Sequence, residues 1–149
     1  DIEAALQETL QKFQHQTGLP TRLQLEGEGL PLPADVQVQV LHVVQEALSN
    51  VRKHAGASHV RLDVHKGPHW RFVVRDNGSG FDTTRQHGET HVGTKIMRER
   101  AERIGATVQI ESRTGQGTSV TLVLPPNPVA ASGLGTVGLN LPADALNAL

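Results

Sequence analysis

The longest run of helical periodicity in the sequence lies between Ala34 and Ala55 and ends at Gly56. Within it, apolar residues recur at steps of three and four, which places them along one stripe of a helix. These positions are Leu41, Val44, Leu48, Val51 and Ala55. A helix with a single apolar stripe needs a second layer of structure to cover that stripe. The rest of the sequence must therefore supply such a layer.

Five short segments with alternating apolar residues predict the strands of that layer. They are residues 23–25, 60–64, 70–74, 108–110 and 120–124. Glycine and proline separate the second segment from the third, and two glycines separate the fourth from the fifth. Alternating runs joined by short turns are typical of antiparallel pairs. We therefore expect two hairpins and one additional strand.

Two further helices complete the predicted elements. Apolar residues spaced by three and four predict a helix over residues 1–17, and a second is expected over residues 94–104. Gly18 and Gly105 directly follow these segments and are typical helix ends. The order of elements predicts an α+β fold, a two-layer sandwich with the helices on one face of the sheet.

Two segments show no periodicity. Residues 77–93 are rich in Gly, Asp, Thr, His and Gln, and a loop of this length inside a compact domain is usually functional. Residues 126–149 carry a single charged residue, Asp144, and we expect them to form a mobile tail. The 149 residues are therefore interpreted as one domain over residues 1–125, followed by the tail.

Composition excludes several classes of function. The chain has no cysteine, which rules out disulfides, thiol nucleophiles and cysteine-ligated metals. A net charge of −1 and only one Trp, three Phe and no Tyr argue against a nucleic-acid partner. No apolar run reaches the roughly 18 residues of a membrane span.

The helix predicted over residues 34–55 carries Glu46, Asn50 and Lys53 at spacings of four and three. Such spacing places the three side chains on one helix face. An amide oxygen can ligate a hard cation such as Mg²⁺, an ammonium can neutralise a phosphate, and a carboxylate can orient or deprotonate water. A solvated polar face has the same spacing, so this set alone leaves both interpretations open.

A second polar motif, Asp-Asn-Gly-Ser-Gly at residues 76–80, directly follows a predicted strand. Asn-Gly predicts a hairpin turn, but no strand follows within reach. Glycines there would let a ligand approach the backbone, and a carboxylate at a strand end can accept a bond from an exocyclic amine. Gly93 opens the third predicted helix, where backbone amides can bind phosphate, and residues 115–118 are typical of a hairpin turn.

Taken together and in this order, these motifs resemble the ATP-binding domain of the GHKL superfamily, which gyrase-type ATPases and sensor histidine kinases share. Residues 45–55 and 97–101 look like the subfamily whose response regulators are of the LuxR/NarL type. Residues 13–125 look closest to nitrate/nitrite-type sensor kinases. The resemblance covers roughly residues 1–125. It implies the Bergerat-type fold, in which helices cover one face of a mixed, mostly antiparallel sheet.

The resemblance implies ATP and Mg²⁺ as ligands, with the phosphates at the long helix. Asn50 would ligate Mg²⁺ and Lys53 would contact the phosphates. Glu46 would orient a metal-bound water or the attacking group, which makes these three the implied catalytic residues. His54 would lie near the ribose or phosphates, and a packed or exposed histidine is the alternative. Gly93 would line the phosphate site.

The resemblance places the base at the second motif. Asp76 would accept a hydrogen bond from the adenine amino group, and Gly80 and Thr118 would line the base pocket. Gly78 and Gly117 belong to the same implied binding set. Residues 1–18 would be the leading helix and residues 77–93 the ATP lid. The sequence departs from the family pattern over residues 91–96, where two of three customary glycines are replaced.

The implied function is the catalytic domain of a sensor histidine kinase, which donates the γ-phosphoryl group of ATP to a histidine on a separate dimerisation domain. None of the eight histidines is followed by Asp or Glu, the usual setting of that acceptor, so we do not expect self-phosphorylation. Two alternatives remain open. One is a GHKL-type ATPase in which Glu46 activates water, and the other is a non-catalytic nucleotide-sensing module.

The resemblance also implies a setting for the domain. The response regulator would be an indirect partner, and the domain would be cytoplasmic within a membrane-anchored parent. The chain begins at Asp1 rather than Met, which we interpret as the cut edge of a larger kinase. Without dimerisation helices, the fragment is expected to be a monomer.

Overall fold

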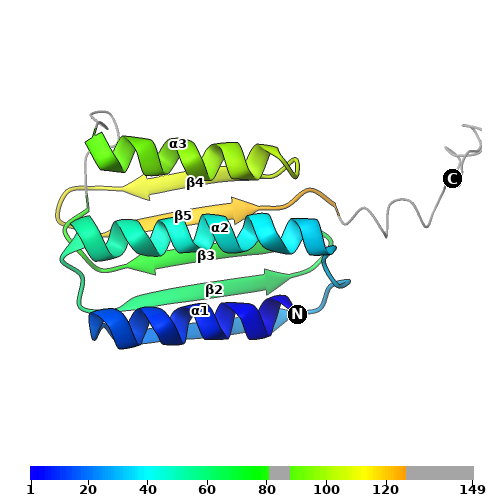
Figure 1. Ribbon diagram of the computed structural model, residues 1–149, viewed down its shortest axis with the longest axis horizontal. Helices are drawn as coiled ribbons and strands as arrows, with labels where there is room; N and C mark the ends of the chain where they lie inside the picture. Colours follow the sequence, from blue (N-terminus) through cyan, green and yellow to red (C-terminus); the bar gives the residue numbers. More distant parts are fainter. Residues whose placement is uncertain (81–87, 127–149) are drawn as a thin grey trace, which may run out of the picture.

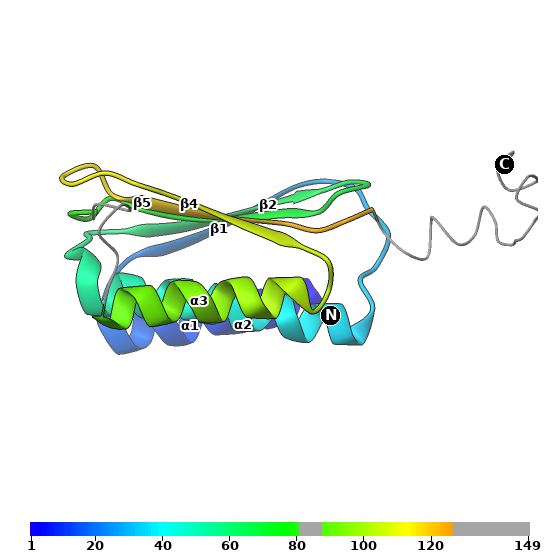
Figure 2. The same ribbon diagram turned by 90° about the horizontal axis from the view of Figure 1, so that it is seen from above.

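The computed structural model describes residues 1–80 and 88–126, with the backbone alone for residues 54, 55 and 88–91. The chain forms two layers, a five-stranded sheet and a layer of helices packed on one of its faces (Figures 1 and 2). This arrangement confirms the predicted α+β two-layer sandwich. Within the described ranges, no helix is both long and apolar enough to cross a membrane.

Helix α1, Ile2–Thr17, matches the helix predicted over residues 1–17. The Asp1 carboxylate caps its first turn by accepting from the backbone N–H of Ala4 at 2.8 Å. Gly18 ends the helix in the left-handed conformation, with φ 75°. The apolar residues at helical spacing all point into the core, where they are Ile2, Leu6, Leu10 and Phe13.

The long helix changes character near its end. Helix α2 covers Ala34–Asn50 and continues as a π-helical segment, η1, over Val51–Ala55. The sequence predicted the extent of this helix correctly but not its last turn. Apolar periodicity does not distinguish an α-turn from the wider π-turn, which is often found at functional sites.

The sheet has the order β1-β2-β3-β5-β4. Its strands are β1 Thr21–Gly27, β2 Val60–Lys66, β3 Arg71–Asp76, β4 Thr107–Ser112 and β5 Thr118–Val123. The predicted hairpins β2–β3 and β4–β5 are antiparallel, β3 pairs antiparallel with β5, and β1 runs parallel to β2. The sheet is therefore mixed and mostly antiparallel, as expected.

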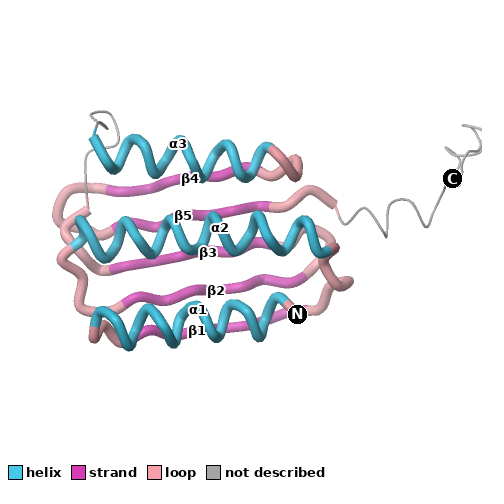
Figure 3. The backbone as a smooth tube through the Cα atoms, in the orientation of Figure 1, coloured by secondary structure: helices cyan, strands magenta, loops and turns pink. Residues whose placement is uncertain are grey.

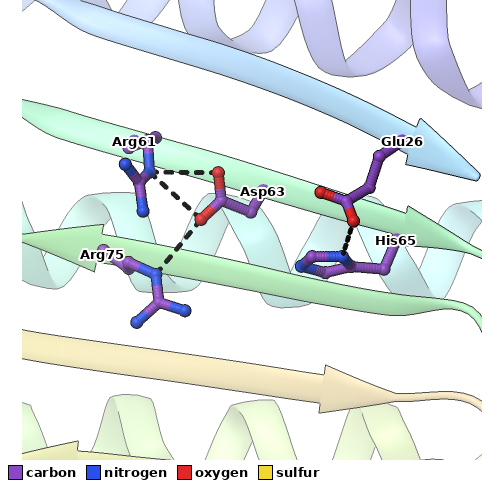
Figure 4. A network of polar contacts seen from close by, with 5 residues as sticks. All are labelled: Glu26, Arg61, Asp63, His65 and Arg75. Atoms are coloured by element: carbon purple, nitrogen blue, oxygen red, sulfur yellow. Dashed lines mark hydrogen bonds and ion pairs between the residues drawn. The ribbon is translucent and has the colours of Figure 1, made fainter.

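The two faces of the sheet differ in polarity. Apolar residues of β2, β3 and β5 face the helices and are buried at Val60, Leu62, Val64, Phe72, Val74, Val120 and Leu122. On the outer face, Arg61 and Arg75 each place Nε 3.1 Å from the same Asp63 oxygen, Oδ2 (Figure 4). Asp63 is only 7% exposed, so the two guanidinium groups compensate a carboxylate that would otherwise be costly to bury.

Helix α3 covers Gly88–Glu102 and corrects two predicted boundaries. The helix was expected to begin at Thr94 after a loop over residues 77–93. It begins at Gly88, so residues 88–93 are helical. Gly93 lies inside the helix, where close packing against α2 accounts for it better than a helix start. Residues 81–87 and 127–149 of the expected lid and tail lie outside the described residues.

Candidate functional site

The predicted motifs meet at one end of the sandwich. The C-terminal end of α2, the first turns of α3, the end of β3 and the start of β5 all lie at the same side of the molecule (Figures 1 and 3). Two of these segments belong to the helix layer and two belong to the sheet. The fold thus brings together residues that are more than 60 positions apart in the sequence, from Glu46 to Thr118.

The helix side of this end is defined by the contact between α2 and α3. A Cβ atom added to Gly93 would lie 2.7 Å from Glu46 Oε2, 3.0 Å from Asn50 Oδ1 and 3.1 Å from Asn50 Nδ2. Glu46 and Asn50 are both half-buried. Three residues predicted from two separate motifs therefore share one contact, and glycine at position 93 leaves room beside the two polar side chains.

The donor atoms of this contact suit a hard cation. Mg²⁺ prefers carboxylate and amide oxygens and usually keeps several waters, so one or two protein oxygens are sufficient to hold it. Glu46 Oε2 and Asn50 Oδ1 are oxygens of these kinds, and both border the space that a Cβ at Gly93 would fill. The residues present thus fit the expected magnesium site.

The remaining residues of the predicted phosphate set are less closely defined. Lys53 lies in η1 and its side chain is exposed at the same end of the molecule. Asn50 is the last residue of α2, so the change from α-helical to π-helical geometry lies between Asn50 and Lys53. The backbone of His54 lies in η1, and its side chain is outside the described residues.

The sheet side of the site is a row of polar residues at one register position. Asp76 on β3 pairs with Thr118 on β5, which pairs with Ser112 on β4. Because side chains alternate along a strand and Val74, Val120 and Ile110 face the helix layer, these three residues face it too. Asp76 and Thr118 were predicted from their motifs, and the register now places them side by side.

The Asp76 carboxylate is held at the edge of this row. Its Oδ1 accepts from the backbone N–H of Gly78 at 2.8 Å, and the backbone N–H of Thr118 also bonds to the carboxylate. Burial nevertheless raises the pKa of Asp76 above its ordinary value, because these amide bonds lower it by less than desolvation raises it. A half-buried carboxylate of this kind can accept a further hydrogen bond from a ligand.

The two glycines flanking this row are required by backbone packing. Gly80 has φ +68°, and a Cβ there would collide with the carbonyl oxygen of Arg113. Gly117 has φ +81°, and a Cβ there would collide with the carbonyl oxygen of Asp76. Both positions bring the β4–β5 turn close to the segment after β3. A depression of about 470 Å³ lies beside this turn, lined by Ile110, Glu111, Ser112, Arg113, Gln116 and Gly117.

Sequence reasoning missed the part played by Ser112. Its Oγ lies 2.7 Å from Thr118 Oγ1 and donates to the carbonyl oxygen of Gly117 at 3.3 Å. A lone serine has no motif of its own. Counting outward from the turn would have paired residue 112 with residue 118, because the two lie three positions on either side of Gly115.

Asn77 has a structural role that its place in an Asn-Gly pair did not predict. Its Oδ1 accepts from the backbone N–H groups of Ser58 at 2.9 Å and His59 at 3.1 Å. Its Nδ2 donates to Ser58 Oγ at 2.7 Å. Asn77 therefore ties the connection between η1 and β2 to the end of β3, next to Asp76.

Comparisons with known proteins found a matching family and similar relatives. The profile of the family described as "Histidine kinase-, DNA gyrase B-, and HSP90-like ATPase" matches residues 35–128. The nitrate/nitrite sensor protein NarQ of Escherichia coli (strain K12) is 38% identical over 124 residues, which are 82% of this chain and 22% of NarQ. The signal transduction histidine-protein kinase/phosphatase DegS of Brevibacillus brevis is 32% identical over 121 residues, 80% of this chain and 31% of DegS.

A solved structure shares the fold. The histidine kinase domain of the blue-light activated histidine kinase from Erythrobacter litoralis EL346 superposes with a TM-score of 0.68 at 20% identity. The match covers 84% of this chain and 61% of that domain. The chain spans between a fifth and a third of the length of the two curated relatives, so it corresponds to one part of such proteins.

Proposed function

Because the chain belongs to the family of histidine kinase-, DNA gyrase B- and HSP90-like ATPases, we propose that it binds ATP with Mg²⁺ and donates the γ-phosphoryl group to a histidine on a separate dimerisation domain. It is an ATPase domain of the type found in sensor kinases of two-component signalling. The observation that carries the proposal is the meeting of the Glu46–Asn50–Gly93 contact with the Asp76–Thr118 row at one end of the fold.

The sheet side of the site suits the adenine base. Asp76 is an acceptor at a strand end, and the exocyclic amine of adenine is a donor. The carboxylate is half-buried with a raised pKa, so a ligand N–H would compensate part of its desolvation. We assign Asp76 to the amine, with Thr118, Gly78, Gly80 and Gly117 lining the base pocket.

The helix side suits the phosphates. We assign Asn50 as a ligand of Mg²⁺, Glu46 as the group that orients water or the attacking atom, and Lys53 as a phosphate contact. When bound, the metal supplies neutralisation of phosphate charge, which is a large part of what phosphoryl transfer requires. Gly93 contributes by keeping its side of the contact free of a side chain, so that Asn50 Oδ1 can stay accessible.

The acceptor and the setting follow from the same proposal. The acceptor is a histidine of the dimerisation domain of a larger kinase, and a response regulator is the indirect partner. We further propose that the parent is membrane-anchored with this domain in the cytoplasm, residues 77–93 forming the ATP lid and residues 126–149 a tail. NarQ, described as a nitrate/nitrite sensor protein and matched over 22% of its length, supports a larger sensor protein as the parent.

Calorimetry with a non-hydrolysable ATP analogue tests binding. We expect heat of binding that depends on Mg²⁺ in the wild-type chain and is lost in Asp76→Asn. The second step is transfer from γ-labelled ATP to the separately produced dimerisation domain of a curated relative. Labelled acceptor supports the proposal, whereas absence of binding heat would overturn it.

Water activation by Glu46 is the alternative that a specific observation favours, because Glu46 Oε2 lies beside Asn50 at the Gly93 contact. Such an ATPase would release phosphate steadily without labelling any histidine. Its phosphate release would vanish in Glu46→Gln while binding of the ATP analogue persisted. Measuring release and transfer in the same reaction separates the two functions.

A further inference from the structure

The hydroxyl of Thr118 has a neighbour that controls its direction. Ser112 on β4 and Thr118 on β5 are register partners, and their oxygens lie 2.7 Å apart. Ser112 Oγ also lies 3.3 Å from the carbonyl oxygen of Gly117, to which it donates. A hydroxyl has a single hydrogen to donate. Ser112 can make both contacts at once only if its own hydrogen goes to Gly117 and it accepts the hydrogen of Thr118.

This polarity determines what Thr118 presents to a ligand. With its hydrogen directed at Ser112, the remaining capacity of Thr118 Oγ1 consists of acceptor lone pairs. The neighbouring Asp76 is also an acceptor, and it pairs with Thr118 across the two strands. The sheet side of the site therefore presents two adjacent acceptors to any base that enters it.

Two acceptors distinguish between the purines. Adenine carries an amine with two N–H donors where guanine carries a carbonyl acceptor, O6. The amine satisfies the acceptors directly or through a bridging water. A carbonyl in that place would face two acceptors and could donate to neither, and such mismatches give strong discrimination.

We infer that Ser112 is a positioning residue, which holds the Thr118 hydroxyl as an acceptor and thereby strengthens selection of ATP over GTP. This inference rests on the proposed function, because it assumes that the base binds at Asp76 and Thr118. It adds a residue whose proposed effect on the base is transmitted through the Thr118 hydroxyl. If Ser112 lost its hydroxyl, the Thr118 hydrogen would be free to rotate and donate to a guanine O6.

The test measures dissociation constants for ATP and GTP in the presence of Mg²⁺, using the full chain and calorimetry. In Ser112→Ala we expect the preference for ATP over GTP to fall about threefold to tenfold, the range of one hydrogen bond between neutral groups. Ser112→Thr keeps a hydroxyl and should restore most of the preference. Ser119→Ala is the matched control, because Ser119 lies on β5 next to Thr118 but on the opposite face of the sheet.

A second background separates positioning from a structural effect. In Thr118→Val the hydroxyl that Ser112 would orient is absent, so adding Ser112→Ala should change the preference no further. Equal weakening of ATP and GTP in Ser112→Ala, or the same loss of preference in the Thr118→Val background, would overturn the inference. A wild-type chain that binds neither nucleotide would instead refute the proposed function.

Discussion

Replacing Gly93 by alanine separates the stability of the domain from its binding capacity. The new Cβ would lie 2.7 Å from Glu46 Oε2 and 3.0 Å from Asn50 Oδ1, both closer than a normal contact. Since these atoms belong to side chains, they can move aside without displacing the backbone. Alanine is also the better helix former by about 1 kcal/mol. We therefore expect the free energy of unfolding to change by no more than about 1 kcal/mol.

Nucleotide binding should respond differently. The displaced Asn50 Oδ1 would no longer fit a Mg²⁺ site, which requires near-ideal octahedral geometry. Losing a contact to a charged group costs about 1.5–3 kcal/mol, which corresponds to a rise in the dissociation constant of about 10-fold to 150-fold. Calorimetry with a non-hydrolysable ATP analogue and Mg²⁺ measures this constant, and urea unfolding measures the stability of the same samples.

The matched control is Gly67→Ala, because nothing lies within 4 Å of a Cβ at that glycine and its φ is not in the left-handed region. This variant should bind and unfold like the wild type. Wild-type affinity in a folded Gly93→Ala protein would show that the Glu46–Asn50–Gly93 contact is not where the phosphates bind. A loss of several kcal/mol of stability would show that the two side chains cannot yield.

Three further substitutions test other contacts. Asp76→Asn should raise the free energy of unfolding at neutral pH, because burial raises the pKa of Asp76 and so disfavours its charged form in the folded state. The gain in free energy of unfolding should be full above the raised pKa and disappear as the pH falls below the ordinary range of a carboxyl. Urea unfolding at several pH values measures the gain, and an equal gain at all of them would contradict this reasoning. Asn77→Ala removes three hydrogen bonds and should lower the free energy of unfolding by about 1–3 kcal/mol; an unchanged thermal midpoint would argue against the tie to β2. Asp63→Ala leaves Arg61 and Arg75 side by side without their shared carboxylate. Because both guanidinium groups are partly exposed and can turn to water, the change should cost about 1–3 kcal/mol, whereas wild-type stability would show that the ion pairs are energetically neutral.

The periodicity of apolar residues was sufficient to predict the helices and strands, but not to predict which strands lie next to one another in the sheet. Apolar spacing predicted α1 and both hairpins, because each of these depends on residues close together in sequence. It did not predict that β1 runs parallel to β2 or that β5 lies between β3 and β4. Alternation specifies which face of a strand is buried and says nothing about which strand lies beside it. The order of the strands in the sheet could therefore be determined only from the structure.

The residues of the candidate site likewise fall into those that a local motif predicted and those that depend on packing or strand register. Asp76 and Thr118 lie in recognisable motifs, and the structure places them next to each other. Gly93 was identified as a site residue but was interpreted as the start of a helix, because a glycine beside a loop normally marks a boundary. Its contact with Asn50 depends on how α2 and α3 pack, which no local pattern records. Ser112 depends on strand register and was missed for that reason.

The division of the site between two layers has a consequence for the whole domain. The groups assigned to the base lie on the strands and the turns next to them, and those assigned to the phosphates lie on the helices. A bound nucleotide would therefore contact both layers and hold them together. Ligand binding adds to folding free energy by mass action, about 2.7 kcal/mol when the free ligand is at 100 times its dissociation constant. Amide hydrogen exchange should then slow together at the end of α2 and the end of β3, because neither layer could open there without releasing the nucleotide.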